Sequence, residues 1–327
     1  MKEPKQPSFD YQDNPEDLEY YRKNSKYAPF MREDPFSLDP SLGYQIGVSG
    51  GRTSAYLLRL VLDRNGGLPD NARAIFTNTG KEREETLEFV KEIEERWNVP
   101  ILWLEYWRDE TRRGTKNDPR NIYRVVDFKT ASRKGEPFEM ALETRKTVPG
   151  TGQRFCTSML KIFPADRYLR HELGWKTKNI RKMLGIRRDE ESRATIAFLS
   201  ECPVELPLLS AGIGADEINR FWAESPFDLA LKSGMGNCDL CFMKSVNLSK
   251  GILQKEPERA DQWIEWEKKY GLRMEKHGQF SIPVLRQHRF RRDMTMEELL
   301  TTTLNSDEEF SEEYPAEDGL GCYCGDD

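Results

Sequence analysis

The sequence predicts an α/β fold in which a parallel sheet of about five strands carries helices on both faces. Two observations support this prediction. Short apolar segments alternate with longer segments of helical periodicity between residues 44 and 185, and polar turns rich in Gly, Ser and Thr follow several of the apolar segments. Strands that alternate with helices are typical of a parallel sheet, because each crossover between parallel strands passes over one face of the sheet.

The predicted strands are the short apolar segments at 44–48, 72–77, 100–105 and about 179–185. The predicted helices of the same region lie at 53–63, 82–97 and about 157–171. Beyond residue 200, prolines interrupt the pattern, and helices are predicted near 214–224, 247–255 and 258–270. In the last of these helices, Trp263, Trp266 and Tyr270 recur at helical spacing and are predicted to be core residues.

Composition divides the chain of 327 residues into four expected parts. These are a polar N-terminal extension (1–40), an α/β domain (41–200), a helical region with cysteines (201–290) and an acidic C-terminal tail (291–327). Neither a bilayer-spanning apolar segment nor a secretory signal is present in the sequence. We therefore expect a cytoplasmic protein without a membrane partner, whose six cysteines are reduced.

Charge is unevenly distributed along a chain whose net charge is −6. The segment 108–134 holds nine basic and four acidic residues, and a second basic cluster lies at 286–292. Such a segment suits a nucleic acid or another polyanionic acceptor. The alternative, a solvated face balanced by neighbouring acidic residues, stays open at this point.

A glycine-containing loop separates the first predicted strand from the first helix. Its residues are Ser49, Gly50, Gly51, Arg52, Thr53 and Ser54. Glycines let the backbone approach a ligand closely, and the free N–H groups of a helix's first turn favour an anion such as a nucleotide phosphate. The alternative is an ordinary turn with a Ser or Thr helix cap.

Two further polar turns follow predicted strands. One is Thr77, Asn78, Thr79 and Gly80, and the other runs from Gly185, Ile186 and Arg187 to Arg193. The carboxyl ends of parallel strands meet at one edge of a sheet, where ligands bind in such folds. The sequence therefore predicts a single site built from the three turns.

These motifs together resemble the PP-loop ATP pyrophosphatase superfamily and, within it, the phosphoadenosine phosphosulfate reductase family. The resemblance covers roughly residues 44–270 in the expected order. It includes the segment 154–164, similar to that family's Cys-x-x-x-x-Lys-x-x-Pro motif, and a late Cys-x-x-Cys at 238–241. It implies a PP-loop nucleotide-binding domain, ATP or an adenine sulfonucleotide as ligand, and Mg²⁺.

The resemblance also implies roles for individual residues. Residues 49–54 would surround the phosphates and 77–80 would lie near the adenosine, while Arg52, Lys161, Arg187 and Arg193 would balance phosphate or sulfonucleotide charge. Arg52, Lys161 and Arg187 are the expected catalytic cations. The chain has Arg52-Thr53 where the family has Lys-Asp, so Thr53 supplies no carboxylate near Mg²⁺. Both glycines are kept, which favours binding and splitting of ATP.

Four cysteines are candidate metal ligands. The spacing of Cys238 and Cys241 lets one turn point both thiolates at the same metal or cluster. The resemblance adds Cys156 and implies a [4Fe–4S] cluster, whose fourth ligand is either Cys202 or absent. Zinc is the alternative metal.

Two more cysteines, Cys322 and Cys324, lie in the acidic tail. Reductases of the family carry a nucleophilic cysteine on a C-terminal segment, so either residue is a candidate nucleophile that a thiol reductant would regenerate. A plain surface tail is the alternative.

The sequence thus predicts an enzyme of sulfur metabolism, either a sulfonucleotide reductase or an adenylyl-transferring sulfurtransferase. The alternative is a cluster-bearing nucleotide-binding subunit of a nucleic-acid modification (thiolation) or defence assembly.

Overall fold

The computed structural model describes residues 19, 23, 25–108, 122–195, 202–232, 234–236, 238–275 and 284–311. Within these residues six strands form one sheet in the order β4-β3-β2-β1-β5-β6. The strands are β1 (Gly43–Val48), β2 (Ala72–Asn78), β3 (Ile101–Tyr106), β4 (Tyr123–Val126), β5 (Ile180–Met183) and β6 (Val204–Glu205). Neighbouring strands are parallel except β3 and β4. The predicted α/β class is confirmed.

The edge strands β4 and β6 were not predicted from the sequence. They contain four and two residues, which is too short for a recognisable apolar period. The four central strands lie where their apolar segments predicted them.

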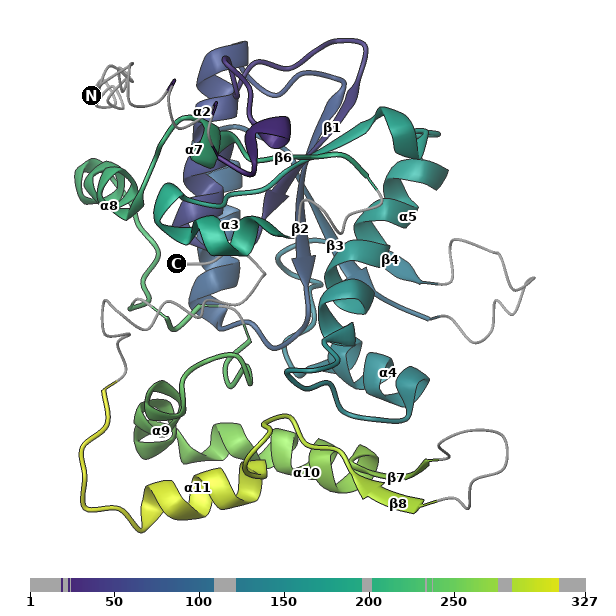
Figure 1. Cartoon of the computed structure of the whole chain (residues 1–327), viewed down its shortest axis with the longest axis vertical. Helices are drawn as coiled ribbons and strands as arrows, with labels where there is room; N and C mark the ends of the chain where they lie inside the picture. Colours follow the sequence, from purple (N-terminus) through teal and green to yellow (C-terminus); the bar gives the residue numbers. More distant parts are fainter. Residues whose placement is uncertain are drawn as a thin grey trace.

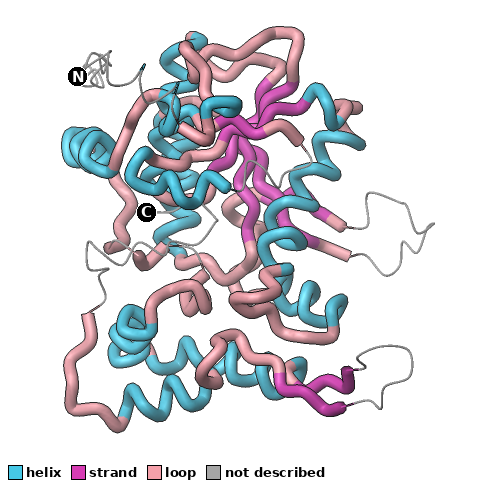
Figure 2. Tube along the Cα trace, viewed as in Figure 1, coloured by secondary structure: helices cyan, strands magenta, loops and turns pink. Residues whose placement is uncertain are grey.

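Helices cover both faces of the sheet, as Figures 1 and 2 show. On β2, Ala74 and Phe76 belong to the large apolar cluster that includes α2 (Arg52–Asn65) and α3 (Glu84–Arg96), whereas Ile75 packs in the cluster of α5 (Phe163–His171). This alternation follows from the two-residue period of a strand. Both faces of the central strands are therefore buried.

The remaining helices connect or extend this core. They are η1 (Ala28–Phe30), α4 (Glu136–Arg145), η4 (Thr157–Ile162), η5 (Thr177–Asn179), η6 (Arg188–Thr195), α7 (Pro207–Ser210), α8 (Ala215–Glu224), α9 (Val246–Lys255), η7 (Pro257–Arg259), α10 (Ala260–Tyr270) and α11 (Met296–Leu304). The helix η4 is a single π-helical segment directly before α5. None of the helices in the described ranges is long and apolar enough to cross a membrane.

A C-terminal layer of α9, α10 and α11 lies beyond the carboxyl ends of the central strands (Figure 1). A two-stranded hairpin of β7 (Leu272–Glu275) and β8 (Val284–Gln287) extends from it. Trp263 and Trp266 are each 1% exposed, which confirms them as core residues. Helix α11 lies inside the range expected as a tail, and the expected division into four parts stays a prediction.

The strand order reverses at β1, which has β2 on one side and β5 on the other. The connections that leave β1 and β5 therefore diverge, and in doubly wound sheets ligands bind at the carboxyl edge beside such a reversal. The predicted turns follow β1, β2 and β5, so the fold brings all three to this edge.

Candidate functional site

The glycine loop after β1 is held closed by its own hydroxyl groups. Ser54 Oγ accepts a hydrogen bond from Ser49 N at 3.0 Å and donates to Gly51 O at 3.0 Å. Gly50 has φ of +90°, and a Cβ there would lie 2.4 Å from Thr86 Cγ2. Position 50 therefore requires glycine both for its backbone conformation and for its close contact with α3.

The N-terminus of α2 faces this loop without a side-chain cap. Gly51 is the N-cap residue, and the first turn contains no acidic side chain. The first N–H groups of the helix are thus suited to an anion. The Arg52 guanidinium is paired elsewhere: Nε and Nη2 lie 2.7 and 2.8 Å from the two Asp228 carboxylate oxygens, and Nη2 also donates to Leu229 O.

The turn after β5 packs against the glycine loop. A Cβ on Gly185 would lie 3.4 Å from Ser54 Cα, and Arg187 Nη1 donates to Thr53 Oγ1 at 3.3 Å. Arg187 also forms ion pairs with Asp189 and Glu190, and Glu190 in turn pairs with the buried Arg193. The structure thus brings Arg187 to the loop, whereas Arg193 is linked to Arg187 through Glu190. Acidic neighbours already balance the charge of both cations. Ile186 is buried and anchors the turn in an apolar cluster.

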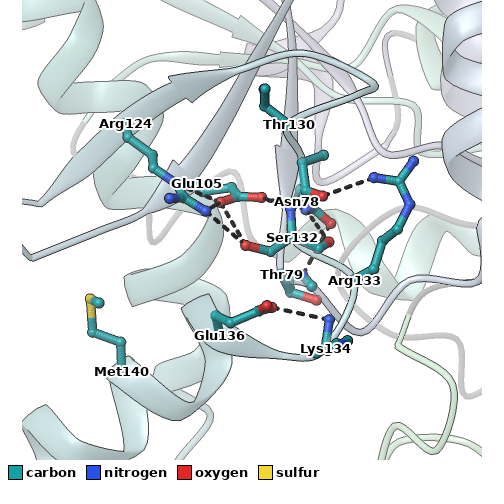
Figure 3. A network of polar contacts seen from close by, with 12 residues as sticks. Asn78, Thr79, Glu105, Arg124, Thr130, Ser132, Arg133, Lys134, Glu136 and Met140 are labelled. Carbon is teal, nitrogen blue, oxygen red and sulfur yellow. Dashed lines mark hydrogen bonds and ion pairs between the residues drawn. The ribbon is translucent and has the colours of Figure 1, made fainter.

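The predicted turn 77–80 begins within β2, and the side chain of Asn78, the last residue of that strand, is used entirely within the protein (Figure 3). This fully buried amide donates to Glu105 Oε1 at 2.6 Å and to Ser132 O at 2.8 Å, and its Oδ1 accepts from Gly80 N at 3.0 Å. These hydrogen bonds fix the conformation of residues 77–80. The backbone of the turn, rather than the Asn78 side chain, is therefore the part suited to a ligand.

Glu105 is a buried carboxylate that the sequence analysis did not single out. It accepts hydrogen bonds from Ser132 N and Oγ and from Arg124 Nε, at 2.6, 3.0 and 2.8 Å (Figure 3). A lone acidic residue in the otherwise apolar segment 101–106 was the available signal. The same contacts bear on the basic segment 108–134: Arg124 pairs with Glu105 and Arg133 with Glu84, so these two cations are already balanced.

Three of the four candidate metal ligands line one pocket at the carboxyl edge of the sheet. Cys156 lies directly before η4, and Cys238 and Cys241 lie in the turn before α9. The cavity volume of this pocket is about 30 Å³. Its other lining residues are Thr79, Phe138, Arg154, Thr157, Leu160, Lys161, Phe242, Met243 and Trp263.

The fourth candidate, Cys202, lies elsewhere. It is buried with Ile75, Leu104 and Ile180 in the apolar cluster under α5. The structure therefore does not bring Cys202 together with the other three cysteines. Cys322 and Cys324 lie outside the described residues.

Charged and polar groups surround the Cys238 thiol. Burial raises its pKa well above the ordinary value, the nearby Glu82 carboxylate adds to the rise, and Lys161 and a contact with Thr79 Oγ1 at 3.4 Å oppose it. Burial also raises the pKa of Glu82, against the charge of Lys161. Lys161, expected among the cations that balance nucleotide charge, is thus placed in the cysteine pocket. Among the described residues, no three His, Cys, Asp or Glu side chains are arranged to hold a single metal ion.

The doubly wound sheet and the three turns at its carboxyl edge define an α/β fold of the kind in which ligands bind at that edge. Residues 44–202 match the phosphoadenosine phosphosulfate reductase domain, a family of the PP-loop superfamily. The chain is also 29% identical, over 217 residues, to an uncharacterized nin region protein of Escherichia phage lambda. That similarity covers 65% of this chain and 70% of the phage protein.

Proposed function

We propose that this chain is an enzyme of sulfur metabolism that binds ATP or an adenine sulfonucleotide at the carboxyl edge of its sheet. In this proposal the cysteine pocket holds a [4Fe–4S] cluster. The observation that carries the proposal is that Thr79 belongs to the turn after β2 and also lines the pocket of Cys156, Cys238 and Cys241. A nucleotide and a sulfur-handling group would therefore be neighbours.

The glycine loop supplies the phosphate site of the proposal. The uncapped N–H groups of α2 are fixed in place before a ligand binds, so they stabilise negative charge on phosphate oxygens without reorganisation. Arg187, beside Thr53, adds a cation on the β5 side. Because Thr53 offers no carboxylate, Mg²⁺ would be held mainly through the phosphate oxygens of the nucleotide.

The donor set of the pocket fits an iron–sulfur cluster. Cys156, Cys238 and Cys241 would hold it, as thiolates are the usual ligands of such clusters. The apolar wall of Phe138, Leu160 and other side chains would limit access of water. When bound, a cluster supplies electron transfer or an open iron that binds sulfur. Lys161 and Arg154 would balance the negative charge of the thiolates.

Two reactions are consistent with this site. In one, a sulfonucleotide is reduced. In the other, an acceptor oxygen attacks the α-phosphorus of ATP and pyrophosphate leaves. A sulfide-level sulfur nucleophile then attacks the acceptor carbon, and AMP leaves with the activated oxygen. The N–H groups of α2 and the Arg187 guanidinium would stabilise the leaving pyrophosphate. A nucleic acid is one candidate acceptor, but the pairing of Arg124 and Arg133 with carboxylates gives that candidate no support.

Metal analysis of anaerobically purified protein tests the cluster. We expect about four iron and four acid-labile sulfide per chain, as in a [4Fe–4S] cluster. Cys241→Ser should lower both contents, whereas Cys202→Ser, a change at the buried cysteine outside the pocket, should leave them intact. Zinc alone, without sulfide, would refute the cluster.

Nucleotide chemistry is tested by incubating the protein with ATP or adenosine 5′-phosphosulfate and a thiol reductant. Pyrophosphate release from ATP would identify the adenylyl-transferring variant, and sulfite release from the sulfonucleotide would identify the reductase. Failure to bind either nucleotide would overturn the proposed function.

A further inference from the structure

The chain directly after the β2 turn is paired with the turn that carries Cys238 and Cys241. Lys81 O accepts a hydrogen bond from Asp239 N at 2.9 Å, and Glu82 forms an isolated antiparallel bridge with Cys238. Two segments far apart in the sequence therefore share backbone hydrogen bonds. We call residues 77–80 the nucleotide turn and residues 238–241 the cysteine turn.

An ion pair between buried side chains crosses the same contact. Lys81 Nζ lies 3.2 Å from Asp239 Oδ2, and the two side chains are 10% and 6% exposed. The other carboxylate oxygen, Oδ1, accepts from Trp263 Nε1 at 2.9 Å and from Leu240 N at 2.8 Å. Asp239 Oδ2 also lies 3.5 Å from Arg259 Nη1, a longer contact with a more exposed side chain. Removal of Asp239 would leave the Lys81 ammonium without its carboxylate, and removal of Lys81 would leave Asp239 only the longer pair, so the Lys81–Asp239 pair resists separation.

Lys81 is also held from the side of α10. Its Nζ donates to Gln262 Oε1 at 3.0 Å and lies 5.6 and 5.7 Å from the ring centres of Trp263 and Trp266. These cation–π contacts fix the ammonium group in one place. Lys81 thus joins the end of the nucleotide turn, the cysteine turn and α10.

We propose that Lys81 and Asp239 are positioning residues that hold the cysteine turn against the nucleotide turn and couple ligand binding at the two. When a ligand restricts the motion of one turn, the ion pair and the shared backbone hydrogen bonds restrict the motion of the other turn as well. Coupling of this kind is reciprocal, so a ligand at either turn stabilises the other. The coupling to a nucleotide rests on the proposed function. The attachment of the cysteine turn to the nucleotide turn through Lys81 and Asp239, which we call the joint, does not.

Thiol alkylation of the metal-free, full-length protein tests the joint without any ligand. Lys81→Met keeps the aliphatic stem and Asp239→Asn keeps the side-chain shape, but each removes the ion pair. We expect each variant to raise the alkylation rate of Cys238 and Cys241 about tenfold, because the cysteine turn opens locally more often. The double variant should add little to either single one, since both remove the same pair.

Two controls separate the joint from a general loss of stability. Cys202, under α5, reports opening of the sheet core and should keep its wild-type alkylation rate in every variant. Lys269→Met removes a lysine from an exposed pair with Glu139 and should change none of the rates. Equal acceleration of Cys202, or unchanged rates at Cys238 and Cys241, would overturn the proposal.

The coupling is tested by repeating the alkylation with saturating ATP or adenosine 5′-phosphosulfate. In the wild type the nucleotide should slow alkylation of the cysteine turn, and in the double variant this protection should disappear while the nucleotide still binds. Equal protection in both proteins would overturn the coupling. If the wild type binds no nucleotide, the proposed function fails, and the rates without nucleotide still decide whether the joint exists.

Discussion

At the scale of single residues, Arg52 is predicted to bind phosphate but is already paired with another side chain of the protein. Its guanidinium makes a bidentate ion pair with Asp228, in the segment after α8. A phosphate at the glycine loop would have to compete with this carboxylate for the same guanidinium. If the loop binds a nucleotide as proposed, its affinity depends on Asp228, a residue that belongs to none of the three predicted turns.

Asp228→Asn should consequently strengthen nucleotide binding. Removal of the carboxylate releases Arg52 toward the loop, and a partly exposed pair is worth up to about 1 kcal/mol, which corresponds to about fivefold in affinity. Calorimetric titration with ATP measures the change. Asp34→Asn, which breaks the exposed pair with Arg64 on the same helix, is the control and should leave affinity unchanged. Weaker binding by Asp228→Asn would show that Asp228 supports the ligand rather than competing with it.

Gly50 gives a second prediction at this scale. Gly50→Ala should destabilise the protein by about 2 kcal/mol or more, because it combines an unfavourable positive φ with a clash against Thr86. Gly66 is a matched control, since it has φ of +69° but no atom within 4 Å of its Cβ position. Urea unfolding should therefore show a smaller loss for Gly66→Ala. Equal losses of unfolding free energy in the two variants would mean that the clash with Thr86 of α3 adds nothing to the cost of the positive φ.

At the scale of elements, the start of α3 is tied to the α9–η7 junction through Arg83 and Glu256. The Arg83 side chain is 5% exposed, and its Nη1 donates to Glu256 Oε1 at 2.9 Å. Burial, the largest influence, raises the pKa of Glu256, but hydrogen bonds from Arg259 and Arg83 outweigh it and leave the pKa below its ordinary value of 4.5. The pair therefore fastens the C-terminal layer to the α/β domain.

The lowered pKa of Glu256 predicts acid sensitivity. Its contribution to stability is present above the unfolded-state pKa and is lost as the pH falls through the folded-state pKa. Glu256→Gln should lower the free energy of unfolding near neutral pH by about 1–2 kcal/mol, because the buried Arg83 loses a charged partner that is itself partly exposed. The variant should also show a weaker decline in stability below about pH 4.5. Urea unfolding across this pH range measures both effects, and an unchanged acid slope would contradict the assignment.

Sequence patterns predicted the elements whose signal is local. Residues 44–48 and 72–77 are short, mostly apolar segments interrupted by Gln45 and Arg73, and the helices at 53–63 and 82–97 have clear periods. The positions of these elements therefore followed directly from the sequence. Strand β4 has only four residues, Tyr123–Val126. It is held in the sheet by its pairing with β3 and by the hydrogen bond from Arg124 to Glu105. Helix α11 begins with a capping box of Thr295 and Glu298 that was a usable signal.

At the scale of the whole molecule, the sequence placed the three turns at one edge because parallel strands share a direction. It did not reveal that the C-terminal layer closes over this edge, since the contact of Asp239 with Lys81 joins distant segments. It could not separate Cys202 from the other cysteines for the same reason. Spacing predicts which cysteines within one turn can bind the same metal. Only the fold determines which cysteines from distant segments lie close together.

We propose above that the edge formed by the ends of β1, β2 and β5 binds an adenine nucleotide. Calorimetric titration of the wild-type protein with ATP and with adenosine 5′-phosphosulfate tests it most directly, with Gly50→Ala and Gly66→Ala as paired variants. We expect at least one nucleotide to bind the wild type, Gly66→Ala to retain binding and Gly50→Ala to lose it. Absence of binding by the wild type, or undiminished binding by Gly50→Ala, would show that this edge is not the nucleotide site.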